Sequence, residues 1–165
     1  MSGLREFLEA HPRVAVLTGA GVSTSSGIPD YRDEHGAWKR ARPVEFRPFM
    51  TDSRVRRRYW ARSTLGWPII REARPNGAHR ALARLESDGV VSHLITQNVD
   101  GLHAAAGHRN VIDLHGRLDT VRCMSCDHMS SRAEMQERLH AANPGWRQAE
   151  GRVAPDGRHW AGPRG

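Results

Sequence analysis

Residues 13–25 read RVAVLTGAGVSTS, an apolar run that ends abruptly in a cluster of glycine, serine and threonine. Continuous rather than alternating hydrophobicity is typical of a parallel strand that is buried on both faces. The glycine-rich residues that follow predict a tight turn that leads into a short helix. This stretch therefore predicts a strand over residues 13–18 at the start of an α/β fold with a parallel sheet.

Two later apolar runs, VVSHLIT and NVIDLHG, predict further strands over residues 90–96 and 110–114. Helical spacing predicts helices between and after the strands. A region without periodicity, residues 33–50, predicts a long loop. Strands that alternate with helices favour a doubly wound sheet, although three strands are few for one.

The predicted helices have recognisable ends and apolar faces. We expect Thr51 to cap the second helix and Asn76 the third, which Gly89 closes. The apolar faces are expected at Ala78, Leu82 and Leu85 in the third helix and at Met135 and Leu139 in the fourth. The four helices are predicted over residues 3–10, 51–63, 78–89 and 131–141.

The overall composition limits the class of protein. A chain of 165 residues predicts one domain, and no stretch of 18 apolar residues suggests a membrane span. The acidic N-terminal segment predicts no secretory signal. Only two cysteines occur, spaced C-x-x-C, so we expect a reducing, cytoplasmic location rather than a disulfide framework.

The formal net charge is +7, and part of the excess is local. A basic patch can attract phosphates or nucleic acid. No aromatic-interleaved RNA signature or helix-turn-helix pattern accompanies it, so we expect a solvated helix face and no specific nucleic-acid partner. The arginines that face only Asp52 and Glu72 in this stretch are Arg54, Arg56, Arg57, Arg58, Arg62, Arg71 and Arg74.

The first strand is followed by Gly19-Ala20-Gly21. A dinucleotide needs a tight turn and a backbone that approaches its pyrophosphate closely, and glycines permit both. Thr24 stands where a G-x-G-x-x-G pattern has its third glycine. The motif alone is therefore equally consistent with a tight strand-to-helix turn.

Polar side chains also follow the later strands, in TQNVDGLH at 96–103 and DLHG at 113–116. Ligands bind at the carboxyl ends of strands in open α/β sheets. Asn98 and Asp100 are candidates for recognising hydroxyls and amides there, and His115 is a candidate general base. The alternatives are a polar turn with Asp100 as a helix cap, and a structural histidine bonded to the backbone.

Cys123 and Cys126 form half of a structural zinc site, because such a site needs four ligands. A second C-x-x-C pair is missing, and His128 is the nearest further candidate. A redox pair is the alternative, although the usual position at the start of a helix after a strand is lacking.

Taken in order, GAGVSTSSGIPDYR, PNGAHRALARLE, TQNVDGLH, DLHG and CMSC resemble the sirtuin family of NAD-dependent protein deacylases, over residues 3–142. SRAEMQERLHAANPGWR is similar to the bacterial and mitochondrial class II branch. The resemblance implies a Rossmann-like domain and a small zinc-binding module, with NAD and an acyl-lysine protein substrate meeting between them. It also implies that the acyl oxygen attacks the nicotinamide ribose and that a histidine then deprotonates a ribose hydroxyl, which yields free lysine, nicotinamide and acylated ADP-ribose.

The resemblance also assigns roles to individual residues. His115 is implied as the general base, with Asn98 and Asp100 beside the reacting groups. Cys123 and Cys126 are implied as zinc ligands. The residues implied to contact NAD are Gly19, Ala20, Gly21, Ser23, Asp30, Tyr31, Arg32, Gln97, Asn98, Val99, Asp100 and His115.

The chain departs from the family pattern after Cys126, where a second C-x-x-C pair and the later glycine-rich and adenine-binding segments are absent. We therefore expect a truncated or frame-shifted sirtuin. Its expected parts are an NAD-binding region over 1–120, the start of a zinc module over 121–142 and an irregular tail over 143–165. The alternatives to a deacylase are an inactive NAD-binding fragment or partner-binding remnant, and a mono-ADP-ribosyltransferase.

Overall fold

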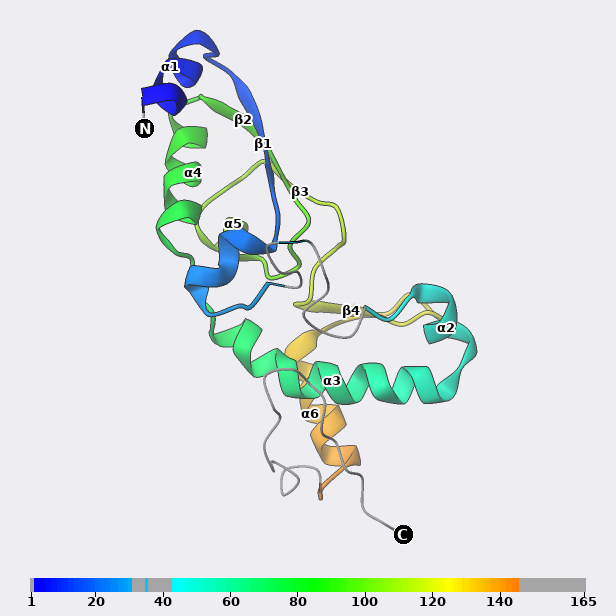
Figure 1. Cartoon of the computed structure of the whole chain (residues 1–165). Coiled ribbons are helices and arrows are strands. Elements are labelled where there is room, and N and C mark those ends of the chain that lie inside the picture. Colours follow the sequence, from blue (N-terminus) through cyan, green and yellow to red (C-terminus); the bar gives the residue numbers. More distant parts are fainter. Residues whose placement is uncertain (1, 31–34, 36–42, 146–165) are drawn as a thin grey trace. The chain divides into compact units, whose positions relative to one another are not determined.

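The computed structural model describes residues 2–30, 35 and 43–145. The chain divides into two compact units, and each unit is built from two separate stretches of sequence. The first unit comprises residues 1–29 and 69–120, and the second comprises residues 30–68 and 121–165. Figure 1 shows the elements of both units.

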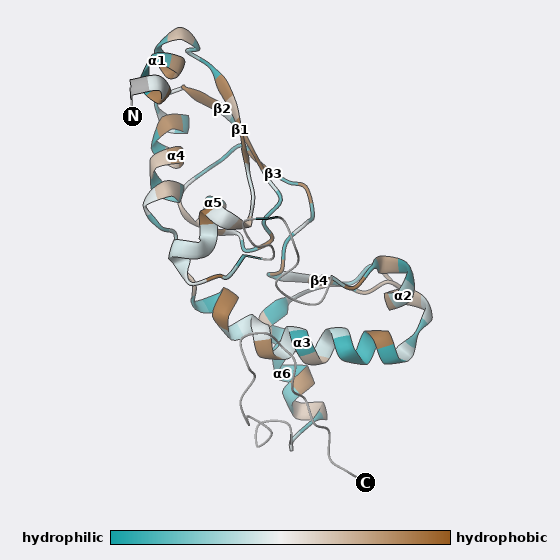
Figure 2. Ribbon diagram, viewed as in Figure 1, coloured by the Kyte–Doolittle hydropathy of each residue, from teal (hydrophilic) through white to brown (hydrophobic). Residues whose placement is uncertain are grey.

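The first unit contains a parallel sheet of three strands in the order β1-β2-β3, formed by Val14–Thr18, Val91–Thr96 and Val111–Asp113. Apolar residues run along β1 and β2 in Figure 2, and Val91 and Leu94 of the central strand are buried. The register pairs Thr18 with Thr96 and Thr96 with Asp113. The predicted parallel α/β sheet is therefore confirmed, and its three strands end at one edge.

Four helices belong to the same unit: α1 (Ser2–Ala10), η1 (Ala20–Ser26), α4 (Gly77–Ser87) and α5 (Leu102–Ala105). The glycine-rich turn leads into η1, a 3-10 helix that Gly27 ends with a φ of 83°. Helix α4 contacts β2. Its buried residue is His79, whereas Ala78 is exposed, so the predicted apolar face of this helix is wrong at that position.

Asn76 caps α4 as predicted, since its Oδ1 accepts the N–H groups of Ala78 at 2.9 Å and His79 at 3.4 Å. Its Nδ2 also donates to Val22 O at 2.7 Å and to Ser26 Oγ at 3.0 Å, both in η1. One side chain therefore stabilises the start of α4 and holds η1 against it.

We expect Asn76→Ala to lower the free energy of unfolding by about 2–3 kcal/mol, because a lost cap costs about 1 kcal/mol and each further hydrogen bond adds about 1 kcal/mol. Urea denaturation measures this loss. Ser131→Ala is the matched control, since Ser131 Oγ caps α6 by accepting the Glu134 N–H at 3.1 Å. Equal losses in both variants would show that the contacts to η1 contribute nothing.

The second unit contains α2 (Phe46–Thr51), most of α3 (Ser53–Glu72) and α6 (Arg132–Ala142), with the short paired strands β4 (Thr120–Arg122) and β5 (Met129–Ser131). The loop predicted over 33–50 is wrong at its end, because α2 begins within it. The helix predicted to end at residue 63 continues past Pro68.

Thr51 does not cap α3, which corrects a further prediction. Its hydroxyl donates back to Arg47 O at 2.9 Å, since Thr51 is the last residue of α2. The residue after it, Asp52, accepts the N–H of Arg54 at 2.7 Å instead. The carboxylate therefore takes the capping role because the chain is still helical at Thr51.

Helix α6 packs on α3 through polar side chains. The Arg132 guanidinium is buried, 5.7 Å from the ring centroid of Trp60 and 5.2 Å from that of Trp67. Gln136, also buried, donates to Thr64 O at 3.0 Å. Met135 and Leu139 of the predicted face are half-buried, and the sequence did not predict that Arg132 and Gln136 are buried more fully than they are. The apolar stem of arginine and its attraction to aromatic rings allow Arg132 to be buried here.

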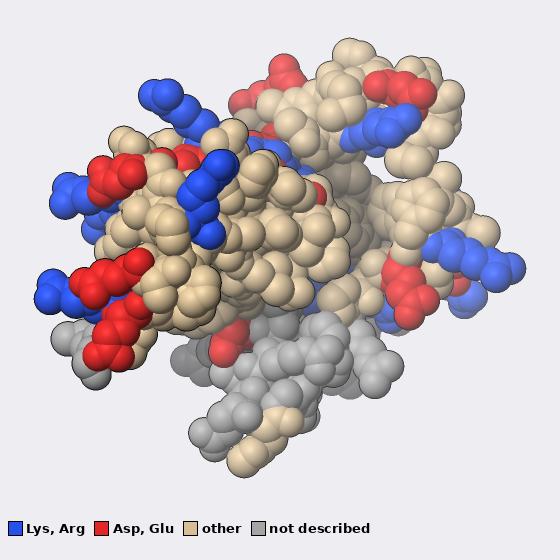
Figure 3. Space-filling model, turned by 90° about the horizontal axis from the view of Figure 1, so that it is seen from above, with Lys and Arg blue, Asp and Glu red and all other residues tan. Residues whose placement is uncertain are grey.

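Surface charge is mixed where the structure describes it. Two arginines of the predicted basic stretch have acidic neighbours, Arg54 with Asp52 at 3.6 Å and Arg71 with Glu72 at 3.8 Å. On the face shown in Figure 3, basic and acidic side chains are interspersed. Among the described residues, no helix combines the length and apolar character that a membrane crossing requires.

Candidate active site

Three predicted site residues meet at the carboxyl ends of β1 and β2. Ser23 Oγ donates to Asp100 Oδ2 at 2.7 Å, and Asn98 Nδ2 donates to Ser23 Oγ at 3.1 Å. Asp100 Oδ1 also accepts the N–H of Leu102 at 2.9 Å, the helix-start contact considered as its alternative role. Ser23 is 1% exposed and Asn98 is 9% exposed, so these two side chains are shielded from water, whereas Asp100 is partly exposed.

The glycine turn lies beside this cluster. A Cβ at Gly19 would lie 3.7 Å from Gln97 Oε1, and a Cβ at Gly21 would meet no other atom within 4 Å. Gln97 is exposed, and its backbone N–H donates to Thr18 O at 3.0 Å. The backbone at 19–21 is thus open to close approach, next to polar side chains, which fits the pyrophosphate of a dinucleotide.

His115 lies in an exposed turn that directly follows β3. Gly116 has a φ of 72° in this turn and donates to Asp113 O at 3.3 Å. No residue in the described part of the chain forms a hydrogen bond with the His115 ring, so the alternative of a backbone-bonded histidine is not seen there. The ring is therefore at the same sheet edge as the Ser23 cluster and is open to solvent.

The remaining residues predicted to contact NAD lie outside this cluster. Val99 accepts the N–H of Leu118 at 2.9 Å through its carbonyl oxygen, which ties the loop after β2 to the loop after β3. Asp30 belongs to the second unit. Tyr31 and Arg32 lie outside the described residues.

The sequence reasoning missed a cluster of three buried histidines behind the site. The ring centroids of His79 and His103 are 4.7 Å apart, and those of His103 and His108 are 5.4 Å apart. Burial lowers the pKa of all three, that of His103 to about 4. The three rings are therefore neutral at pH 7. One signal was available for His79, which accepts the Asn76 N–H at 3.3 Å from the third position of a capping box.

The sequence reasoning also missed two threonines at the strand ends. Thr18 and Thr96 are the last residues of β1 and β2, and their hydroxyl groups are hydrogen-bonded at 2.9 Å. The signal was available in the sequence, because each of these two apolar strand runs ends in a threonine.

Cys123 and Cys126 are exposed in the turn between β4 and β5. Cys123 N–H donates to His128 O at 2.8 Å, and hydrogen bonds from the backbone of Ser125 and Cys126 lower the pKa of the Cys123 thiol. Thiolate is the form of cysteine that binds zinc. No group of three or more His, Cys, Asp or Glu side chains suited to a metal occurs within the described ranges, so His128 is not brought in as a third ligand.

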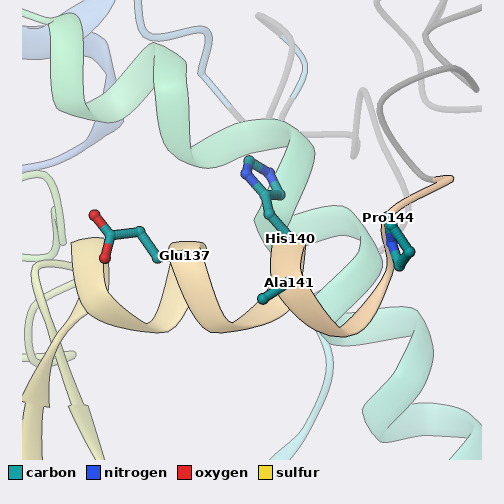
Figure 4. Close-up of a pocket in the computed structure, with 4 residues that line it drawn as sticks. All are labelled: Glu137, His140, Ala141 and Pro144. Atoms are coloured by element: carbon teal, nitrogen blue, oxygen red, sulfur yellow. The ribbon is translucent and has the colours of Figure 1, made fainter.

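A separate hollow of about 430 Å³ lies along the end of α6 (Figure 4). It is lined by Glu137, His140, Ala141 and Pro144, with the His140 ring directed away from Glu137. None of the predicted site residues lines it.

Comparison with known proteins identifies the family. The Sir2 family model matches residues 19–156. The NAD-dependent protein deacetylase 2 of Bradyrhizobium diazoefficiens is 58% identical over 154 residues, which are 93% of this chain and 56% of that protein. The NAD-dependent protein deacetylase of Bordetella pertussis is 56% identical over 157 residues, 95% of this chain and 57% of that protein. The chain thus spans little more than half the length of these relatives.

Solved structures of Sir2 proteins are also similar to this chain. A Sir2 structure with a p53 peptide and NAD+ is 32% identical, with a TM-score of 0.74 over 86% of this chain and 56% of that one. A mutant Sir2 homologue in complex with ADP ribose is 43% identical, with a TM-score of 0.66 over 76% of this chain and 52% of that one. The family model covers the residues that follow each of the three strands, and this chain belongs to the Sir2 family.

Proposed function

We propose that this chain forms the NAD-binding part of an NAD-dependent protein-lysine deacetylase. The observation that carries the proposal is the hydrogen-bonded cluster of Ser23, Asn98 and Asp100 beside an open glycine turn. The relatives named as NAD-dependent deacetylases, and the Sir2 structures with NAD+ or ADP ribose, support the same reading.

The proposed roles follow from position. NAD supplies the ribose carbon that accepts the acyl oxygen. The backbone at Gly19, Ala20 and Gly21 would hold the pyrophosphate, and Ser23 and Gln97 would contact the neighbouring part of NAD. Asn98 and Asp100 orient the ribose and the nicotinamide amide, and Val99 shapes the same loop. On the strength of the family resemblance, Asp30, Tyr31 and Arg32 are proposed as further NAD contacts.

His115 is proposed as the general base because an exposed imidazole at the strand-end edge can accept a ribose hydroxyl proton. Its exposed position in the turn after β3 leaves room for a bound substrate. The acyl-lysine of a protein is the proposed second substrate.

The deciding experiment is nicotinamide release from NAD by the purified chain, with and without an acetyl-lysine peptide. Release that depends on the peptide, together with the appearance of free lysine, is the expected result. Release with transfer of ADP-ribose to protein would favour mono-ADP-ribosyl transfer instead. NAD binding without any release would identify a binding fragment, and the absence of NAD binding would remove the proposal.

We also propose that Cys123 and Cys126 supply two of the four ligands of a structural zinc site. The support is the donation of backbone N–H groups toward the Cys123 sulfur, which stabilises the thiolate. The alternative, a redox pair, would instead show a reversible change in thiol content with a dithiol reagent.

The zinc proposal carries a prediction. Two thiolates leave two of four tetrahedral positions to other ligands. We expect this chain to lose its zinc on dialysis against EDTA and Cys123→Ser to abolish residual binding, as measured by atomic emission. The matched control is Ser125→Ala, which keeps both thiols. One zinc per chain retained after dialysis would contradict the expectation and would point to further ligands.

A further inference from the structure

A second line of hydrogen bonds crosses the ends of β1 and β2 behind the Ser23 cluster. His103 Nε2 lies 2.9 Å from Thr18 Oγ1, and Thr18 Oγ1 lies 2.9 Å from Thr96 Oγ1. The backbone N–H of Asn98 donates to Thr96 Oγ1 at 3.0 Å. We call this series of hydrogen-bonded residues the threonine bridge (His103, Thr18 and Thr96). It leads to Asn98, whose side chain donates to Ser23.

We propose that the threonine bridge is a positioning device that fixes Asn98 for ligand binding, with His103 as its anchor. The proposal rests on the proposed function for the identity of the ligand, NAD. The bridge residues themselves act through Asn98.

The hydrogen atoms of the bridge define one order of donors. Thr18 has a single hydroxyl hydrogen, which it donates to Thr96. Thr18 must then accept from His103, so His103 carries its proton on Nε2. The Nδ1 atom of this ring is buried and has no hydrogen-bond partner among the described residues. A neutral ring of this tautomer satisfies the bridge.

The surroundings of His103 maintain that neutral form. The ring is 2% exposed and faces His79 and His108, which oppose a positive charge, and Asp100, which favours one. Burial has the largest effect and holds the pKa of His103 at about 4. The donor order of the bridge is therefore constant at neutral pH.

Burial also makes the bridge difficult to replace. Thr96 is 2% exposed, so water has little access to substitute for a missing hydroxyl. Asn98 is held at two points, by Thr96 through its backbone and by Ser23 through its side chain. Removal of the Thr18 hydroxyl leaves Thr96 Oγ1, the buried acceptor of the Asn98 N–H, without the donor that orients it.

The chain offers a matched set of variants. Thr18→Val removes the hydroxyl but keeps the branched shape, and Thr18→Ser restores the hydroxyl. Ser92→Ala is the control, because Ser92 Oγ donates to Val14 O at 3.2 Å and also joins β1 to β2, at the opposite end of the strand pair. It removes a comparable contact that does not lead to Asn98.

Calorimetric titration with NAD is the first measurement. We expect Thr18→Val to weaken the Kd about tenfold, which is the usual cost of losing a buried hydrogen bond. Thr18→Ser and Ser92→Ala are expected to stay within about twofold of the unaltered chain. Equal weakening in Thr18→Val and Ser92→Ala, or wild-type affinity in a folded Thr18→Val, would overturn the proposal.

Nuclear magnetic resonance of the unliganded chain tests the bridge without NAD. Nitrogen shifts of the imidazole are expected to show the Nε2–H tautomer of His103. Thr18→Val is expected to move the backbone amide resonance of Asn98, whereas Ser92→Ala is expected to leave it in place. The positioning role would be overturned if His103 is found as the Nδ1–H tautomer. It would also be overturned if the Asn98 amide resonance is the same in Thr18→Val as in the unaltered chain. If His103 is the Nε2–H tautomer and the Asn98 amide resonance responds to Thr18→Val, but the chain binds no NAD, the proposed function is wrong and the positioning of Asn98 by the threonine bridge is retained.

Discussion

Between pH 7.5 and pH 4.5 the folded chain is expected to lose about 2–3 kcal/mol of stability through His103 alone. An unfolded histidine titrates near 6.5, whereas burial lowers the pKa of folded His103 to about 4. Between these values the unfolded chain binds a proton that the folded chain excludes, so the free energy of unfolding falls as the pH falls. The stabilisation is complete above pH 6.5 and is lost toward pH 4.

The neighbouring rings act in the same direction, since burial also lowers the pKa of His79 and His108. A loss of this size is a large share of the 5–15 kcal/mol that is typical of whole domains. Urea denaturation at pH 7.5, 6.0 and 4.5 measures it, within a range in which most carboxylates remain charged.

Two variants separate the His103 contribution. His103→Gln is expected to reduce the loss between pH 7.5 and 4.5 by about 2–3 kcal/mol, because the titrating group is gone. His11→Gln changes an exposed histidine of the same unit and is expected to leave the loss in place. A pH dependence that is unchanged in His103→Gln would show that His103 is not the buried base described here.

Replacing the proposed general base is expected to have the largest effect on catalysis. His115→Ala should slow peptide deacetylation by about 10²–10⁴-fold, which is the usual contribution of a positioned general base. NAD affinity should change little, because the Ser23 cluster does not include His115. The rate of free-lysine formation at saturating NAD measures the effect.

His93→Ala provides the comparison, since His93 is an exposed histidine on β2. It is expected to retain the wild-type rate. An unchanged rate in His115→Ala, with NAD still bound, would remove His115 from the mechanism. A loss of NAD binding in that variant would instead assign His115 to cofactor recognition.

The strands and the first contacts of the site were predictable because they depend on short stretches of sequence. Apolar runs placed β1, β2 and β3, and a parallel register brings the residues after such strands to one edge. Asn98 and Asp100 therefore lie at this edge, where Ser23 forms hydrogen bonds with both of them. Asn76 was predictable as a cap, since it precedes a helical pattern directly.

The other features of the fold and the site could not be predicted, because they depend on residues that are distant in the sequence and that periodicity does not reveal. His79, His103 and Arg132 are polar residues in the interior, and each is buried because a particular neighbour, a second imidazole or a tryptophan ring, packs against it. Helix α2 was missed because its six residues are too few to establish a period. Strands β4 and β5, of three residues each, were missed for the same reason.

The packing of α6 on α3 has a consequence during synthesis. Arg132 and Gln136 follow their α3 partners Ser63 and Thr64 by 69 and 72 residues. At about 5–20 residues per second, the Trp60 and Trp67 side chains emerge from the ribosome roughly 3–15 s before the helix that covers them. Strands β2 and β3 are made during this interval, so all three strands of the sheet have been synthesised before α6. Translation therefore favours completing the first unit first, and any pause between residues 68 and 132 prolongs the time in which α3 is available to chaperones or to aggregation.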